Sequence, residues 1–396
     1  MAKKDKENFK KPTKNTKAPA QQALELTTNY RDWEYMQDQY TETVINEVLE
    51  KLENNQDMQT TVEDEQTVYT LVGFVLAVKN SDQTDYFLKT KSEVYVLDLK
   101  RLCFYTIYPG QFIKVTGLCG ENTIYAQSVQ QLGFSQEKHP QGTWTLSSNP
   151  RILVAGGPYS GKDDLEYELL QTIVEAVHSS NPSTVVLMGP FIEQSNTLIS
   201  NCQVHSSYFK VQNGTIMELQ NKIFEYVKKE TLGKEVVVLP SPKDIAHPFP
   251  IPSVPFQWPS GEEWFKMCPS PSVFKLQDLT FAVLPYDIIH QLVKNTETLS
   301  DRKSNKIATA MENLLISSNF APVLPSGLQV DPLLLKELFW DSVPDIILTT
   351  SKMHFTKQEV FGTLFLNSQK SPNYLLLEVL PPGPPISSRV ECLNNP

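Results

Sequence analysis

The chain of 396 residues exceeds what one hydrophobic core usually fills, so two folded units are expected. Its composition, with 40 % hydrophobic and 20 % charged residues, is ordinary for a globular protein, and no stretch approaches the roughly 20 apolar residues of a membrane span. The basic N-terminal segment has no apolar core and is not a secretory signal. Membrane, secreted, collagen-like and wholly disordered proteins are therefore disfavoured.

The charge is unevenly distributed along the chain. The net charge is −10, but residues 1–20 hold seven lysines and carry +5, which leaves −15 on the rest. A phosphate backbone is bound largely through cations. The acidic charge of the rest of the chain therefore disfavours a large DNA-binding surface. The cysteines form no CxxC pair, so neither a disulfide framework nor a zinc module is indicated, and a reducing compartment fits best, cytosol or nucleus. The five cysteines are Cys103, Cys119, Cys202, Cys268 and Cys392.

The first 66 residues are predicted to contain one helix. Residues 1–30 are predicted as a disordered basic tail, because they hold too few apolar groups to order themselves, and their lysines fit either a nuclear-import signal or a solvated tail. Residues 31–66 are predicted as an amphipathic helix and a linker. Apolar residues recur at helical spacing from Tyr35 to Leu52, and Asn54–Gln66 is polar. The helix is expected to dock on the chain's own body, with a partner protein as the alternative.

Residues 67–135 are predicted to form a five-stranded barrel of the OB type. Five short runs rich in Val, Ile, Tyr and Phe are separated in several places by turn residues, and they lie at 67–78, 85–90, 93–99, 111–118 and 123–129. OB barrels bind single strands through exposed aromatic and basic side chains. Protein docking is favoured over nucleic-acid binding here, because aromatic residues in strands more often belong to the core. The candidates for nucleic-acid contact are Tyr69, Phe74, Tyr86, Phe87, Tyr95, Phe104, Tyr105, Tyr108, Lys79, Lys89, Lys91, Lys100 and Arg101.

Residues 136–150 are predicted as a linker, and residues 151–396 as an α/β domain with a mixed sheet. Helices are expected at Asp163–His178, Met217–Lys229 and Ala308–Ser317. Apolar strands are expected at 151–157, 184–189, 235–240, 345–350, 363–367 and 374–380. The Pro-rich residues 240–271 are expected to form a long, stiff surface excursion, since proline cannot pair inside a sheet.

The turn after the first of these strands nearly matches a phosphate-binding P-loop. Residues 156–162 satisfy the GxxxxGK spacing, but Asp163 stands where a P-loop has the Ser or Thr that ligates magnesium. Asp164 adds a second negative charge, and Pro158 removes one backbone N–H from the cradle. Nucleotide binding is therefore disfavoured, and a strand-to-helix turn capped by an aspartate is the preferred interpretation.

The order of strands and loops also fits a two-metal phosphoesterase that has lost its metal ligands. Such enzymes hold two cations with Asp, Asn and His side chains in the loops after successive strands. At most Glu193, Asp244 and His354 remain as ligands in the corresponding segments, which are 155–157, 189–193, 240–244 and 352–354. No GxSxG motif is present, and the isolated histidines, His247 included, are interpreted as packed or surface residues. The prediction is a two-domain α+β and α/β protein in which an OB barrel precedes an inactive calcineurin-like phosphoesterase sandwich, with no catalytic, metal or cofactor site.

Three of these segments resemble those of a known family. The sequences RILVAGGPYS, VVLMGPFIE and VVVLPSPKDIAHPFPIPSVPF look like the characteristic segments of the B subunit of DNA polymerase alpha–primase, its second-largest and non-catalytic subunit. The match is residue by residue at Pro158-Tyr159, at Gly189-Pro190-Phe191, and from Pro240-Ser241 through Asp244 and His247 to Phe256. A barrel followed by a degenerate phosphoesterase-like domain is also the order found in that family, and the resemblance covers residues 67–380.

The resemblance implies a scaffold without an active site. Members of this family bind the C-terminal domain of the polymerase catalytic subunit on a surface formed by both domains, and they link it to primase. The resemblance thus implies a role in RNA–DNA primer synthesis during replication initiation, lagging-strand synthesis and telomere C-strand fill-in. It also implies nuclear localisation, telomere or replisome factors as further partners, weak or indirect DNA contact, and no membrane association.

Three alternatives stay open. The chain fits an accessory B subunit of polymerase delta or epsilon, a single-strand-binding OB protein, or a residual metal-dependent phosphoesterase that uses Asp244, Glu193 and His354. The scaffold interpretation predicts an exposed apolar patch that bridges the two domains, since permanent partner interfaces are large and apolar.

Overall fold

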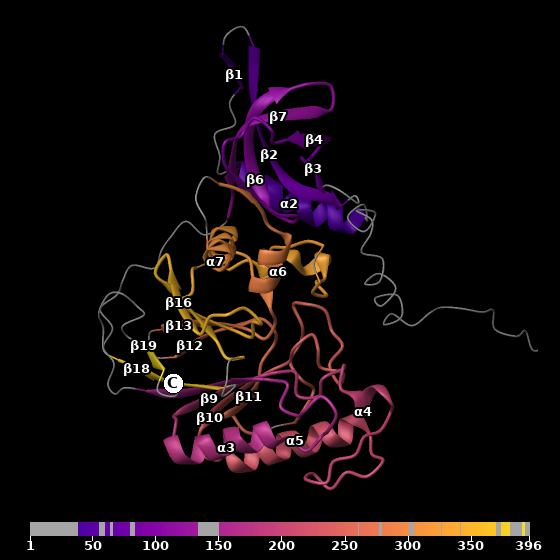
Figure 1. The fold of residues 1–396 in the computed structure, drawn as a ribbon, viewed down its shortest axis with the longest axis vertical. Coiled ribbons are helices and arrows are strands. Elements are labelled where there is room, and N and C mark those ends of the chain that lie inside the picture. Colours follow the sequence, from indigo (N-terminus) through magenta and orange to yellow (C-terminus); the bar gives the residue numbers. More distant parts are fainter. Residues whose placement is uncertain are drawn as a thin grey trace, which may run out of the picture.

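The computed structural model describes two bodies, a β-barrel and a layered α/β body, that lie against each other along the long axis of the molecule (Figure 1). The described residues are 39–54, 60–63, 66–79, 84–133, 150–259, 261–276, 279–300, 305–325, 327–340, 342–369, 374–380 and 390–392. The predicted tail of residues 1–30 and nearly all of the predicted linker of residues 136–150 lie outside them. The domain boundaries at 67–135 and 151–396 stay predictions. Within the described residues, no helix is long and apolar enough to cross a membrane.

The predicted amphipathic helix is present as α2, Gln39–Asn54. Residues 35–38 of that prediction lie outside the described residues. Four apolar side chains recur at helical spacing and are at most 3 % exposed, so the helix docks on the chain's own body as expected. These four are Ile45, Val48, Leu49 and Leu52.

The polar linker predicted at Asn54–Gln66 is wrong in part. Thr60–Glu63 forms strand β1, which pairs antiparallel with the start of the next strand. The pairing runs through backbone groups, which every residue of this segment possesses, so the polarity of the side chains does not reveal it.

The five predicted barrel strands are present and close into a barrel, which is compatible with the OB type. They are β2 (Gln66–Lys79), β3 (Thr84–Lys89), β4 (Val94–Asp98), β6 (Phe112–Cys119) and β7 (Thr123–Gln131). The order β2-β3-β4-β7-β6 closes through the pairing of β6 with β2. Val75, Leu88 and Ile113 alternate with outward-facing residues and fill the interior, where they are fully buried.

The α/β body contains a first sheet of six strands in the order β11-β10-β9-β8-β18-β19. β8 to β11 run parallel, as the strand–helix–strand pattern predicts, and β18 lies antiparallel to β8. The strands are β8 (Arg151–Gly156), β9 (Thr184–Met188), β10 (Glu235–Leu239), β11 (Phe265–Met267), β18 (Tyr374–Val379) and β19 (Val390–Cys392). One face is covered by α3 (Glu168–Ser180) and α5 (Ile216–Glu230), and α4 (Thr197–Ser200) is a single turn after β9 (Figure 1).

A second sheet packs on the other face of the first, in the order β12-β13-β15-β17-β16. Its strands are β12 (Ser272–Leu276), β13 (Leu279–Leu284), β15 (Ile346–Thr349), β16 (Lys357–Val360) and β17 (Thr363–Asn367). Its outer face carries α6 (Ile288–Asn295), α7 (Lys306–Ser317) and the 3-10 helix η2 (Pro332–Leu338). The body therefore has four layers, helix, sheet, sheet and helix (Figure 1).

The barrel and the α/β body share one hydrophobic core. Phe74 and Phe112, on the outside of the barrel, belong to the same buried cluster as Leu49 of α2, Leu338 of η2 and Ile289 of α6. All five are at most 5 % exposed, so the side chains at the junction are as buried as those of a domain interior. The two domains are therefore joined as one packed unit.

A short two-stranded sheet, which the sequence did not predict, adds a second connection. β5 (Tyr105–Ile107) of the barrel pairs antiparallel with β14 (Glu297–Leu299) of the α/β body. Tyr86 and Tyr105 both donate hydrogen bonds to the Glu297 carboxylate, at 3.0 and 2.8 Å. We call this connection the β5–β14 seam.

The helix predicted at Asp163–His178 begins five residues later than expected, at the start of α3. The Asp164 carboxylate accepts hydrogen bonds from the backbone N–H groups of Gly161, at 3.4 Å, and Glu166, at 3.0 Å, so it stabilises a turn instead of capping the helix. Tyr167, in the left-handed conformation with φ 58°, then leads into the helix.

Residues 240–271 are not the surface excursion predicted from their prolines. Ile251 is completely buried in the core shared with the barrel, and Phe256 is 5 % exposed in the cluster beneath α5. Strand β11 also lies within this segment and pairs with β10. Proline excludes ladder pairing only at its own position, and the apolar residues between the prolines make the buried contacts.

Candidate functional site

The carboxyl ends of the parallel strands meet at one edge of the α/β body, where the sequence places its candidate residues. In open α/β sheets, the loops at this edge form the usual ligand site. Three loops, after β8, β9 and β10, carry the Gly-Pro-aromatic and Pro-Ser segments. The loops after β15 and β17 of the second sheet complete the edge.

Glycines at the ends of β8 and β9 let these loops touch one another. A Cβ atom on Gly157 would lie 2.1 Å from the carbonyl oxygen of Pro190, and a Cβ atom on Gly189 would lie 2.1 Å from Oδ2 of Asp244. A larger residue at either position would therefore collide with backbone or with a buried carboxylate. The glycines of the two Gly-Pro motifs are thus required for packing.

The aromatic residue of each Gly-Pro motif points into the core. The fully buried Tyr159 donates its hydroxyl hydrogen to the carbonyl oxygen of Met188, at 2.9 Å, at the end of β9. The Tyr159 ring centroid lies 5.0 Å from that of Phe191, which lies 5.7 Å from that of Phe256. We call Tyr159, Phe191 and Phe256 the aromatic plug, because they fill the space beneath the loops.

Asp244 joins the loop after β9 to the loop after β10. Its Oδ1 accepts from the backbone N–H groups of Phe191, at 2.5 Å, and Ile192, at 3.1 Å, and its Oδ2 accepts from that of Ser241, at 2.9 Å. Burial raises the pKa of Asp244 to about 7, Glu193 adds to this increase, and the three N–H donors oppose it. Both carboxylate oxygens are occupied by the chain's own backbone.

The structure brings together two of the three residues considered as metal ligands. Glu193 and Asp244 form a backbone bridge, whereas His354 is exposed on the loop after β15. Across the described ranges, no group of three or more His, Cys, Asp or Glu side chains is gathered in a way that could hold a metal ion. His247 is 3 % exposed, burial lowers its pKa, and its ring centroid lies 4.9 Å from that of Phe256, which fits the packing role predicted for it.

Two polar residues that the sequence analysis did not single out fix the loops of the second sheet. Asn367 donates from Nδ2 to the carbonyl oxygens of Ser351, at 2.9 Å, and Phe355, at 3.1 Å. Asp287 accepts from the Ser351 hydroxyl, at 2.6 Å, and from the Lys352 N–H, at 2.8 Å. An Asn or Asp at or just after the end of an apolar strand is the signal that identifies such residues.

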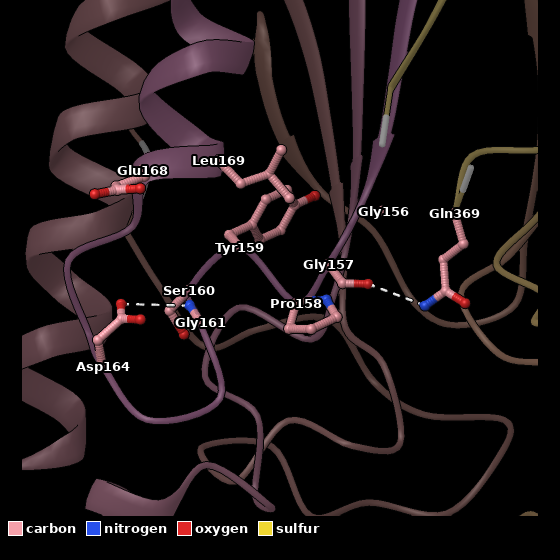
Figure 2. Close-up of a pocket in the computed structure, with 10 residues that line it drawn as sticks. All are labelled: Gly156, Gly157, Pro158, Tyr159, Ser160, Gly161, Asp164, Glu168, Leu169 and Gln369. Carbon is pink, nitrogen blue, oxygen red and sulfur yellow. Dashed lines mark hydrogen bonds between the residues drawn. The ribbon is translucent and has the colours of Figure 1, made fainter. Parts of the chain in front are cut away.

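A cavity of about 430 Å³ opens beside the P-loop-like turn (Figure 2). Its acidic lining side chains are Asp164 and Glu168, and Gln369 donates to the carbonyl oxygen of Gly157, at 3.2 Å. Figure 2 shows the Asp164 carboxylate bound to the N–H of Gly161, so the turn is closed by its own aspartate. A phosphate here would face carboxylates, which argues against nucleotide binding.

The barrel residues considered for nucleic-acid contact fall into three groups. Phe74 and Tyr108 are fully buried and Tyr86 is 8 % exposed, so these aromatics belong to the core as predicted. Lys89 and Lys91 form ion pairs with glutamates of α2. The exposed or half-buried candidates are Tyr69, Phe87, Tyr95, Lys100, Arg101, Phe104 and Tyr105, and the side chain of Lys79 lies outside the described residues.

Comparison with known proteins agrees with the three motifs. A family model described as that of the DNA polymerase alpha/epsilon B subunit matches residues 152–357. The B subunit of DNA polymerase alpha from Mus musculus is 21 % identical over 287 residues, which cover 68 % of this chain and 46 % of the mouse protein. The B subunit of DNA polymerase alpha from Schizosaccharomyces pombe is 24 % identical over 293 residues, which cover 67 % of this chain and 49 % of the yeast protein.

The chain spans about half the length of the curated relatives that it matches. The family model itself covers more than half of the chain, including the segments after β8, β9 and β10. These segments carry the resemblance that the sequence predicts, which the comparisons confirm. The chain belongs to the B-subunit family of DNA polymerases alpha and epsilon.

Proposed function

We propose that the chain is the accessory, non-catalytic subunit of DNA polymerase alpha–primase and acts as a scaffold. The observation that carries this proposal is the single core shared by the barrel, α2 and the α/β body, because it makes two domains one rigid platform. The relatives named above belong to polymerase alpha, which favours polymerase alpha over delta or epsilon.

The β5–β14 seam carries one exposed large apolar side chain from each of the two domains. Phe104, directly before β5, is 75 % exposed, and Leu299 of β14 is 46 % exposed opposite Tyr105. Exposed large apolar side chains at such a junction are typical of protein interfaces. We infer that this seam binds the C-terminal domain of the polymerase's catalytic subunit.

In this role the chain links the catalytic subunit to primase and supports RNA–DNA primer synthesis. Replication initiation, lagging-strand synthesis and telomere C-strand fill-in are the processes served, with the nucleus as the compartment. Telomere or replisome factors are further partners, and DNA contact through this scaffold is weak or indirect.

Co-expression of the chain with the C-terminal domain of the polymerase alpha catalytic subunit from the same organism tests the proposal. We expect one complex that survives size-exclusion chromatography in high salt, because an apolar interface is insensitive to screening. The corresponding delta and epsilon domains serve as competitors. A chain that stays free in the presence of the alpha domain would refute the scaffold role, and preference for another domain would reassign the polymerase.

The α/β body is proposed to be an inactive phosphoesterase-like sandwich. Its helix–sheet–sheet–helix layers support that ancestry, and the occupied oxygens of Asp244 argue against a two-metal centre, which needs several free anionic ligands. Purified chain with manganese and a chromogenic phosphodiester should show no turnover above buffer. Turnover that disappears in His354→Ala, an exposed position whose change spares the fold, would revive the phosphoesterase hypothesis.

A further inference from the structure

The outer face of β2, β3 and β4 is built like the ligand face of an OB barrel. In such barrels, the second and third strands and the neighbouring loops bind oligonucleotides, and here these strands are β3 and β4. Cross-strand partners place two rows of side chains on this face. The rows are Phe74, Lys89 and Val94, and Leu76, Phe87 and Val96.

Helix α2 covers the β2 and β3 side of this face. Phe74 and Leu76 are at most 6 % exposed in the cluster that contains Leu49, and Phe87 packs against the same cluster. Figure 1 shows α2 lying along the side of the barrel that faces the α/β body. Val94 and Val96, in contrast, lie at the β4 ends of the two rows and are 39 % and 42 % exposed, so the β4 side of the face is left uncovered.

The helix also neutralises the basic residues of the face. Glu42 Oε1 lies 2.6 Å from Nζ of Lys89, and Glu53 Oε2 lies 2.6 Å from Nζ of Lys91. The two glutamates are eleven residues apart, which is three turns of an α-helix, so they project from one side of α2. The helix holds four glutamates and one lysine, so it presents a negative surface where a phosphate backbone would otherwise lie.

We propose that α2 occupies the oligonucleotide face of the barrel and closes it to single-stranded nucleic acid. The apolar side of the helix takes the place of stacked bases, and its carboxylates take the place of phosphates on Lys89 and Lys91. Single-strand binding needs free cations beside a stacking surface, and α2 neutralises Lys89 and Lys91 and covers Phe74 and Leu76. This inference concerns the barrel alone and does not depend on the partner of the seam.

Charge reversal on the helix tests the proposal in the full chain. The ion pairs are partly exposed, so Glu42→Lys with Glu53→Lys should leave the fold intact, which thermal melts check. Fluorescence anisotropy with labelled oligothymidylate of about 20 nucleotides, longer than one OB barrel covers, measures binding. We expect at least a tenfold gain in affinity over wild type at low salt.

The salt dependence identifies the mechanism. Each phosphate contact to a single strand adds about −0.7 to the slope of log K against log salt, so the four cations of the double variant should give a slope of about −1 to −3. Adding Lys89→Glu and Lys91→Glu to the double variant should abolish the gain. A neutral pair, Glu42→Gln with Glu53→Gln, should show a smaller gain and remains informative if the reversed pair is unstable.

Glu218→Lys with Glu225→Lys is the matched control, because both residues are exposed on α5 and the change in net charge is the same. Equal gains in the control and in the α2 variant would mean that net charge alone acts, and the proposal would fail. It would fail equally if wild type bound the oligonucleotide tightly and lost that binding on substitution of Lys89 and Lys91 by alanine, since the face would then be open.

Discussion

Leu49 of α2 lies where the barrel, the helix and the α/β body meet, so its truncation to alanine tests whether the shared core unites them. The side chain is completely buried. Removing three carbon atoms costs about 2.4 kcal/mol by transfer alone, at about 0.8 kcal/mol for each. The cavity left behind raises the loss to about 3–4 kcal/mol. At about 2–4 °C per kcal/mol, the melting temperature should fall by roughly 6–16 °C.

Urea unfolding followed by two probes measures this loss. Far-UV circular dichroism reports both domains. Trp340, which is 5 % exposed in the shared core, reports the junction by fluorescence in a background where the other four tryptophans are replaced by phenylalanine. We expect the two probes to shift together to lower urea in Leu49→Ala. The neighbouring Glu50, which is exposed, is the control, and Glu50→Ala should change the free energy of unfolding by no more than about 0.5 kcal/mol.

The reasoning would be refuted by a loss below about 1 kcal/mol for Leu49→Ala, which is no more than an average point mutation costs. It would also be refuted if the fluorescence transition stayed in place while the circular dichroism transition moved. That outcome would mean that α2 stabilises the barrel without joining it to the α/β body.

Four further predictions concern the strand-end loops and the seam. Asp244→Ala leaves three buried N–H groups without an acceptor, so urea titration should show a loss of about 3–5 kcal/mol, and a loss below about 1 kcal/mol would contradict the role of Asp244 in joining the loops. Burial raises the pKa of Asp244 from 3.8 to about 7, so its stabilising contribution is complete below about pH 4 and is lost as the pH rises to about 7. Thermal melts should therefore show wild type losing stability relative to Asp244→Asn across that range and no further change above it; a relative gain would reverse the argument. Gly189→Ala, whose Cβ would lie 2.1 Å from a buried oxygen, should cost about 3 kcal/mol or more, whereas Gly120→Ala, with its nearest neighbour at 3.5 Å, should cost less than about 1 kcal/mol in the same assay. Phe104→Glu should weaken capture of the catalytic-subunit domain at least tenfold without changing the melting temperature, and Leu232→Glu, 74 % exposed elsewhere, should leave capture unchanged; equal effects would remove the seam from the interface.

Elements whose own side chains reveal their burial could be predicted from the sequence. The runs RILVAG, TVVLM and EVVVL are apolar at nearly every position because both faces of the first sheet are covered, and each is a strand. The five barrel strands and the spacing of Ile45, Val48 and Leu52 gave equally direct predictions.

Elements held by distant backbone pairing could not be predicted. Glu297 and Thr298 show no strand pattern, and β14 exists only because residues 105–107 lie beside it. The start of α3 moved for a similar reason, since the competing turn depends on which N–H groups reach Asp164.

In the candidate site too, residue types could be predicted to matter, but the contacts between distant residues could not. The sequence identified Asp244 as one of three remaining candidate ligands, but two of the donors that occupy it come from residues 191 and 192, about fifty positions earlier. Residue types alone indicate which ligands a loop offers, and only the folded chain shows which groups have already been satisfied.

The place of β18 has a consequence for synthesis on the ribosome. This strand pairs with β8 in the middle of the first sheet, although Tyr374–Val379 is translated more than two hundred residues after Arg151–Gly156. Until it emerges, one side of β8 is an open edge next to apolar neighbours, the kind of edge that recruits other strands. A message cut short before residue 374 would therefore yield a fragment prone to aggregation, and the pairing of β8 with β18 can form only after residues 374–379 have been translated.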